Sequence, residues 1–221
     1  LKKAVRWQNN RNFKRKFIIK VPKGISLKIV AKGSLLNFHD EFKNQLSIRL
    51  DYGRLYINRI ENPKNELTIN NSLLIAHEIS GGKLDADRVF KALISELNNV
   101  DIKSEFSKIE IGKLGKGNKI IDFNSKYFIY NFHQNFGRFS LETDYSEINL
   151  FCPKNKDYYI ETFGHNTVHY NNNIITKIPP SRKNESSKMM SIGSETSPNK
   201  IKINTAHGII RFGEDFIDIE E

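Results

Sequence analysis

The chain has 221 residues, of which 38% are hydrophobic and 11% aromatic, and this apolar content excludes global disorder and fits one domain over residues 1–221. The formal net charge is +10, but residues 1–39 carry 11 of the 35 basic side chains and no acid. Because the rest of the chain is close to neutral, we expect no nucleic-acid binding, which normally needs basic groups spread along a face.

The first element that we predict is a β-hairpin over residues 13–33. Apolar residues alternate over 17–21 and again over 25–29, as they do on strands with one buried face. Between these runs, Pro22 presets the φ angle of a turn and Gly24 suits its last position. Two short strands joined by a tight turn follow from this pattern.

A twelve-residue pattern recurs through the rest of the chain. Its copies are LSIRLDYGRLYI at 46–57, VDIKSEFSKIEI at 100–111, IDFNSKYFIYNF at 121–132, FSLETDYSEINL at 139–150 and IKINTAHGIIRF at 201–212. A weaker copy lies at 160–170, so the repeat units span 46–170 and 201–212. The middle copies follow one another at intervals of about 20 residues, which is typical of coiled solenoids.

The apolar residues change parity within each copy. Ile102 lies on one face of a strand, whereas Ile109 and Ile111 have the opposite parity. Burying both sets requires a bend, and small residues such as Ser107 and Ser146 follow the aromatic position and suit a corner. The residues expected in one shared core are Ile102, Ile109, Ile111, Leu141, Ile148 and Leu150. The aromatic positions are Tyr52, Phe106, Tyr127, Tyr145 and His207.

Two segments depart from the repeat. Residues 84–97 would also suit a short helix, but we predict a strand because they lead directly into the copy at 100–111. Residues 171–199 contain asparagine, proline and serine clusters with few apolar groups. We therefore predict a long polar insertion there, with residues 180–199 as the most mobile internal segment.

The residues alone favour an all-β repeat fold, either a solenoid of two-strand units or an antiparallel β-sandwich or barrel, because periodicity does not report strand direction. From Phe17 to Phe212 the chain resembles a bacterial adhesin family related to the head domains of auto-transporter adhesins. The resemblance rests on repeats of the type S/T-x-Y/F-S/G-x-hydrophobic-x-hydrophobic and on FIIKVPKGISLKI, FKALISEL and AHGIIRF. The insertion at 171–199 and the concentrated N-terminal charge depart from the family.

The resemblance implies a right-handed, single-stranded β-helix-like solenoid. It also implies export through a signal peptide to the periplasm, the outer-membrane surface or the exterior. The resemblance implies no catalytic residue in this chain. The chain begins at Leu1 rather than Met, which fits the removal of a leader. No segment reaches the ~20 apolar residues of a membrane helix, so we expect no transmembrane segment.

Histidines and acidic residues are the first candidates for metal binding or catalysis. His165 and His169 would share one strand face about 13 Å apart, too far to hold one metal ion without a bend. For His207 we expect stacking in a ladder of aromatic positions rather than a titrating switch. Two acidic groups could serve a polysaccharide-cleaving β-helix, although acids at alternate positions usually form a solvated face. The groups are Glu142, Asp144 and Glu147, and Asp85 and Asp87.

Three further features have simpler interpretations. Cys152, the one cysteine, follows an apolar run, so we expect a buried, unreactive thiol and neither a disulfide nor a cysteine-based metal site. The glycine-rich residues 111–119 lack the spacing of a phosphate loop and predict a turn. The basic residues Arg6, Arg11 and Lys14–Lys16 could contact an anionic envelope surface. They could equally keep an edge strand from aggregating.

We therefore expect a non-catalytic envelope or cell-surface protein that binds a glycan or another protein. The alternatives are a carbohydrate-active enzyme on a β-helix and a purely structural spacer. We predict no catalytic residue, no metal and no cofactor. A cleft with converging carboxylates would favour the enzyme, whereas an exposed aromatic stripe would favour binding.

Overall fold

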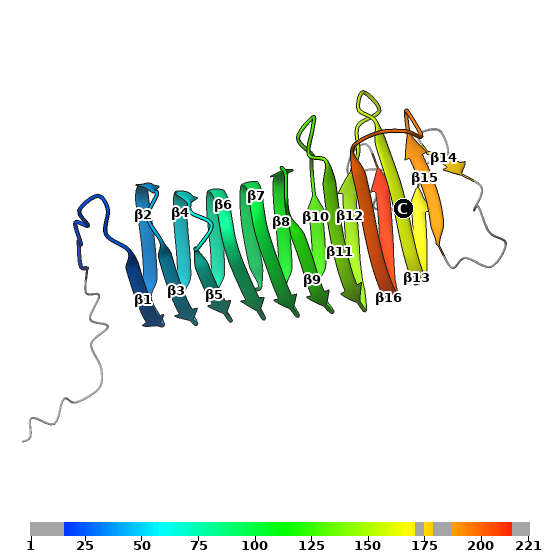
Figure 1. Ribbon diagram of the computed structural model, residues 1–221. Helices are drawn as coiled ribbons and strands as arrows, with labels where there is room; N and C mark the ends of the chain where they lie inside the picture. Colours follow the sequence, from blue (N-terminus) through cyan, green and yellow to red (C-terminus); the bar gives the residue numbers. More distant parts are fainter. Residues whose placement is uncertain (1–15, 171–174, 179–186, 214–221) are drawn as a thin grey trace, which may run out of the picture.

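The computed structural model describes residues 16–170, 175–178 and 187–213, and these residues form an all-β solenoid without a helix (Figure 1). Its strands are β1 (Leu27–Lys32), β2 (Leu35–Phe42), β3 (Leu46–Asp51), β4 (Arg54–Glu61), β5 (Glu66–Asn70), β6 (Leu73–Asp87), β7 (Lys91–Glu105), β8 (Lys108–Leu114), β9 (Lys119–Phe123), β10 (Lys126–Ile129), β11 (Arg138–Asp144), β12 (Ser146–Phe151), β13 (Tyr158–Tyr170), β14 (Thr176–Ile178), β15 (Lys188–Ile192) and β16 (Lys200–Gly213). The solenoid prediction is confirmed, and an antiparallel sandwich or barrel is excluded because the strand pairs are parallel except β13 with β15 and β14 with β15.

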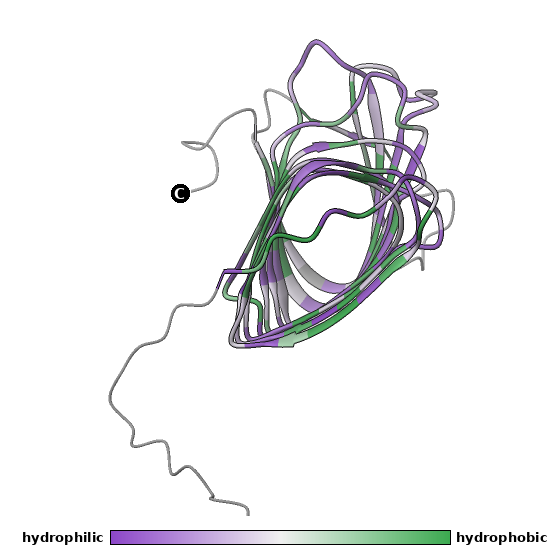
Figure 2. Ribbon diagram, turned by 90° about the vertical axis from the view of Figure 1, so that its left-hand side faces the viewer, coloured by the Kyte–Doolittle hydropathy of each residue, from purple (hydrophilic) through white to green (hydrophobic). Residues whose placement is uncertain are grey.

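The strands stack in two ladders along the solenoid. The first ladder contains β1, β3, β5, β9 and β11, and the second contains β2, β4, β8, β10 and β12. The long strands β6, β7, β13 and β16 take part in both. In the N-terminal turns, paired residues are 19 apart, as in Leu27 with Leu46 and Leu35 with Arg54. Viewed along the axis, the turns superimpose around one core (Figure 2).

The corners predicted at Ser107 and Ser146 are confirmed. Each follows an aromatic residue in the left-handed backbone region, with φ 49° at Phe106 and 57° at Tyr145. The small side chain has a hydrogen-bonding role, because Ser107 Oγ accepts a hydrogen bond from the Val89 N–H of the preceding turn at 3.0 Å. The predicted core residues are at most 2% exposed, and they are Ile102, Ile109, Ile111, Leu141, Ile148 and Leu150.

The copy at 121–132 has a different register from the one its pattern predicts. The pattern places Tyr127 at the exposed corner, but its side chain is fully buried. The corner lies earlier, at Asn124 with φ 52° and at Ser125, whose hydroxyl accepts a hydrogen bond from the Ser107 N–H at 3.0 Å. The position before the corner serine is therefore Asn124 in this copy and not an aromatic residue. Phe123 lies one residue earlier, in register with Glu105 and Asp144, and is the exposed ring beside this corner.

Residues 84–87 and 91–97 are strand, as predicted, because they belong to β6 and β7, and residues 88–90 form the corner between the two strands. The hairpin predicted over 13–33 is wrong. Residues 13–15 lie outside the described part, residues 16–26 form no strand, and β1 pairs in parallel with β3. The turn itself does form at Lys23 and Gly24. The alternation over 25–29 is satisfied by packing Leu27 and Ile29 against the core of the next turn.

The C-terminal end has an order in space that differs from the order in the chain. Strand β16 lies between β12 and β13, parallel to both (Figure 1). Strand β15 then pairs antiparallel with β13, and β14 with β15. The predicted mobile insertion at 171–199 is therefore wrong for 188–192, where buried Met190 and Ile192 give β15 an apolar face. Residues 171–174 and 179–186 of that prediction lie outside the described residues.

Candidate binding surface

A row of four rings follows one outer corner of the solenoid, and we call it the corner ridge: Phe106, Phe123, Tyr145 and His207. The ring centroids are 5.6 Å apart from Phe106 to Phe123 and 6.0 Å from Phe123 to Tyr145. His207 stacks on Tyr145 at 4.9 Å with an interplanar angle of 10°, which confirms the predicted stacking. All four side chains are exposed. The ridge is a continuous aromatic surface that crosses four turns.

Backbone strain holds two of these rings outward. The positive φ angles of Phe106 and Tyr145 cost about 1–2 kcal/mol each for a residue with a Cβ. Gly33 and Asn71 occupy the corresponding corners of other turns, and both residue types adopt this conformation readily. Bulky exposed rings therefore stand where a smaller residue would form the same corner with less strain.

Asp144 fixes the C-terminal end of the ridge. Its Oδ1 lies 3.2 Å from Nδ1 of His207 and accepts a hydrogen bond from the His207 backbone N–H at 3.1 Å. His165 is the register partner of His207 on β13, and His169 is exposed on the same strand. No group of three or more His, Cys, Asp or Glu side chains able to hold a metal occurs within the described ranges.

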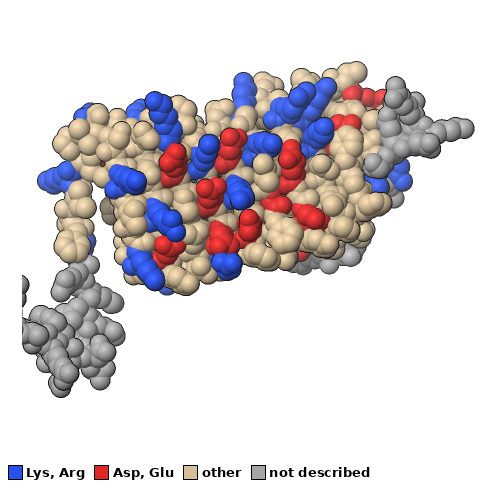
Figure 3. Space-filling view, turned by 60° about the horizontal axis from the view of Figure 1, so that its bottom comes forward, with Lys and Arg blue, Asp and Glu red and all other residues tan. Residues whose placement is uncertain are grey.

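Four of the five acids selected from the sequence form ion pairs, and Asp85 is exposed on β6. Glu142 pairs with Lys119 at 3.3 Å, and Asp87 pairs with Arg88 at 2.7 Å. Glu147 pairs with one cation on β10 and with another on β16. Figure 3 shows acidic and basic side chains interspersed over one face of the solenoid. The paired carboxylates therefore lie beside basic side chains on a solvated surface, and they do not converge in a cleft.

The core contains a cluster of polar side chains that was not predicted from the sequence. We call it the polar seam, and it consists of Ser104, Asp122, Tyr127, Thr143 and Ser146. The carboxylate of Asp122 is 6% exposed and accepts hydrogen bonds from Ser104, Thr143 and Ser146 at 2.5, 3.0 and 2.5 Å. Tyr127 Oη lies 2.5 Å from the Ser104 hydroxyl. Burial raises the pKa of Tyr127, and the Asp122 charge raises it further. The hydroxyls of Ser104, Thr143 and Ser146 thus serve to hold one buried carboxylate.

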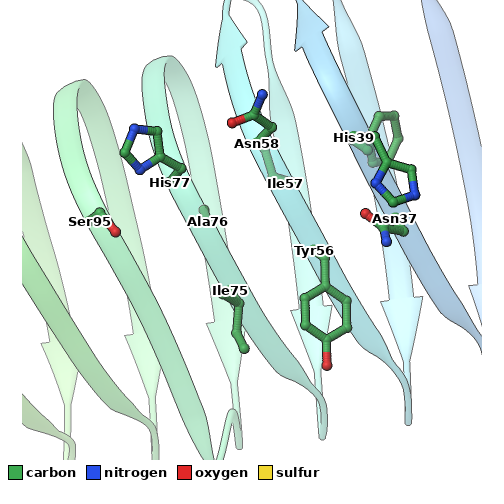
Figure 4. Close-up of a pocket in the computed structure, with 10 residues that line it drawn as sticks. Asn37, His39, Tyr56, Ile57, Asn58, Ile75, Ala76, His77 and Ser95 are labelled. Atoms are coloured by element: carbon green, nitrogen blue, oxygen red, sulfur yellow. The ribbon is translucent and has the colours of Figure 1, made fainter.

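A second candidate is a shallow hollow of about 290 Å³ on the outer face over β2, β4, β6 and β7 (Figure 4). His39 and His77 lie at its upper rim in this view, with Asn58 between them, and Asn37 and Tyr56 lie below. These groups are uncharged or weakly basic hydrogen-bonding side chains. Such a lining suits a neutral polar ligand, although an open hollow buries little of it.

The remaining sequence candidates have structural roles. Cys152 is 1% exposed, and burial raises the pKa of its thiol well above the usual range, as expected for an unreactive cysteine. Residues 115–118 form the turn predicted in the glycine-rich stretch, while Gly112 lies in β8, where a Cβ would come 2.7 Å from the Ser95 carbonyl oxygen. The basic residues Arg6, Arg11 and Lys14–Arg15 lie outside the described part of the chain.

Comparisons of the chain with protein-family models, with curated proteins and with solved structures found no match. Among the residues that the structure describes, no helix is long and apolar enough to cross a membrane.

Proposed function

We propose that this chain is a non-catalytic binding protein whose corner ridge contacts a glycan. The observation that carries the proposal is the row of four exposed, adjacent rings. Contiguous exposed apolar patches mark interaction sites, whereas singly exposed apolar residues do not. Adjacent turns of such a solenoid lie about 4.8 Å apart, so the rings offer a repeating contact to a chain-like ligand.

The surroundings of the ridge support a carbohydrate over an apolar ligand. Glu105 immediately precedes Phe106, and Asp144 immediately precedes Tyr145, and both carboxylates are part-exposed. Sugars present apolar ring faces and hydroxyl donors, which match aromatic faces and carboxylate acceptors.

The resemblance to bacterial adhesins supports an adhesin-like protein that is exported to the envelope or the cell surface. This part of the proposal rests on the repeat motifs and on nothing in the geometry. Fractionation of cells that produce the protein tests it. Recovery in the periplasm, the outer membrane or the medium supports export, whereas recovery in the cytoplasm of cells with an intact secretion system contradicts it.

Glycan binding is tested with a panel of neutral and acidic oligosaccharides, with affinity measured by calorimetry. We expect a Phe106→Ala/Tyr145→Ala variant to bind at least about tenfold more weakly, since truncation of central aromatic contacts typically costs more than about 1 kcal/mol. Tyr56→Ala, in the hollow of Figure 4, is the matched control and should bind like the wild type. Melting curves of all variants check that the solenoid is intact.

Four outcomes decide against parts of the proposal. If only Tyr56→Ala loses binding, the ligand binds in the hollow and not on the corner ridge. If the protein binds another protein but no glycan, the ligand is a protein. Shortening of the oligosaccharide during incubation favours the carbohydrate-active enzyme. The absence of any ligand for the intact protein leaves the structural spacer as the better account.

A further inference from the structure

The N-terminal end of the solenoid has free strand edges. Within the described residues, β1 pairs only with β3, and β2 pairs only with β4. Leu36 and Phe38 of β2 point toward the core but are only partly buried. An edge of this kind offers unpaired backbone groups and an apolar surface to another strand.

An apolar segment lies just before this edge and contacts little. In KFIIKV at residues 16–21, Phe17, Ile18 and Ile19 are 78%, 77% and 76% exposed. Figure 1 shows the described residues before β1 as a loop that stands away from the body. Three adjacent large apolar side chains in water are unusual for a soluble protein and point to a missing contact.

The repeat places this segment in phase with β2. In the first turns, paired residues are 19 apart, as in Leu36 with Leu55 and Phe38 with Ile57. Moving 19 residues upstream from Leu36 gives Phe17, and the same step from Phe38 gives Ile19. The inward positions of a further strand would thus be apolar. Ile18 would fall beside Asn37, whose side chain faces outward.

The linker to β1 also has a suitable length. Residues 22–26 would join the new strand to β1, as residues 43–45 join β2 to β3 and residues 62–65 join β4 to β5. The linker already contains a turn at Lys23 and Gly24, with Gly24 at φ 89°. A five-residue connection lies within the usual range for neighbouring elements.

We propose that the free edge of β2 is a strand-accepting site and that its occupant is residues 16–21 of the same chain. The segment docks in parallel, with Phe17 beside Leu36 and Ile19 beside Phe38. Docking removes Phe17 and Ile19 from water and pairs the backbone edge, while Ile18 stays on the outer face beside Asn37. It also keeps that edge from accepting strands of other molecules.

A disulfide pair tests the register directly. Ile18→Cys with Asn37→Cys places two thiols on outward-facing register partners, at a separation that a disulfide can span. The matched control is Ile18→Cys with Glu41→Cys, which moves one thiol four residues, or about 13 Å, along β2. Both target positions on β2 are exposed, and the native Cys152 is buried. Mild oxidation is followed by mass spectrometry and non-reducing gels.

We expect the first pair to form an intramolecular disulfide in the monomer while the control pair stays reduced. Adding Phe17→Asp to the first pair should slow its formation, because the docked position is apolar. Equal rates for the two pairs would overturn the proposal, and so would disulfides that join two molecules, because the occupant would then be a second copy. Failure of the Ile18→Cys/Asn37→Cys pair to oxidise, with its thiols accessible to alkylation, also contradicts it.

Discussion

At the C-terminal end of the solenoid, β15 lies antiparallel against β13, and its own residues Met190 and Ile192 are buried. At the N-terminal end, β1 has one described partner, its inward residue Ile29 is only half-buried, and Val30 is 70% exposed. Both ends belong to one core with the same type of turn. They differ in whether a strand from elsewhere in the chain covers the last turn.

This difference shows how a repeat protein gains cooperativity from a strand placed out of order. In a simple solenoid each turn contacts only its neighbours, so terminal turns separate first. Strand β16 comes last in the chain but pairs with β11, β12 and β13. The C-terminal turns therefore cannot separate without removal of β16, whereas the first turn can separate alone.

The largest expected effect is on stability at the C-terminal end. Ile203→Ala empties a fully buried position on β16 and should lower the free energy of unfolding by about 2–5 kcal/mol. Ile29→Ala on β1 is the matched control and should cost about 1 kcal/mol or less, because a half-buried side chain loses less contact. Urea denaturation measures both. Equal losses would mean that the two ends are equally closed.

The next effect concerns the interior. Asp122→Ala leaves the hydroxyls of Ser104 and Thr143 without their buried acceptor and should cost about 1–3 kcal/mol. The preceding turns have Ile69 and Ala86 in line with Ser104, so the polar seam is confined to the later turns. Asp85→Ala, on the exposed face of β6, is the control. A gain in stability for Asp122→Ala would show that the carboxylate is unfavourable there.

The smallest expected effect is an acid dependence of stability in the later turns. The Glu96 carboxylate accepts a hydrogen bond from His133 at 2.8 Å, which lowers the pKa of Glu96 below its ordinary value of 4.5. A second hydrogen bond, from the Asn98 side chain, lowers this pKa further. Because the folded pKa is lower than the unfolded one, this stabilisation is complete at neutral pH and is lost as the pH falls below about 4.5.

Glu96→Gln should therefore reduce the loss of stability between neutral and acidic pH. His133→Ala should produce a smaller reduction, because Asn98 still donates to Glu96, and the double variant should match Glu96→Gln, because both changes remove the same ion pair. Thermal melting at a series of pH values measures the effect. An unchanged acid dependence in both variants would show that this pair does not contribute.

Much of the core was predictable from the parity change within each copy. Ile102 and Ile109 are both large and apolar and differ in parity, so only a bend can bury both. The structure confirms that bend at Ser107. The turns at 66–80 and 82–98 were missed as copies because Asn71 and Arg88, not aromatic residues, occupy their corners.

Other features were not predictable because they depend on pairing between distant strands. Alternating apolar residues at 25–29 look the same in a hairpin and in a solenoid. Nothing local in β16 indicates that it pairs with both β12 and β13. The corner ridge was anticipated at Phe106, Tyr145 and His207, but Phe123 entered it only once the corner at Ser125 was known.

Hydrogen exchange resolved by strand tests the contrast between the two ends most directly. Backbone amides in strands with one partner open locally, whereas those held on both sides open only with larger units. We expect β1 to exchange first, and β16 to exchange as slowly as β6 and β7 despite its position near the end of the chain. Exchange of β16 before β1 would contradict the account of a C-terminal end closed by its last strand.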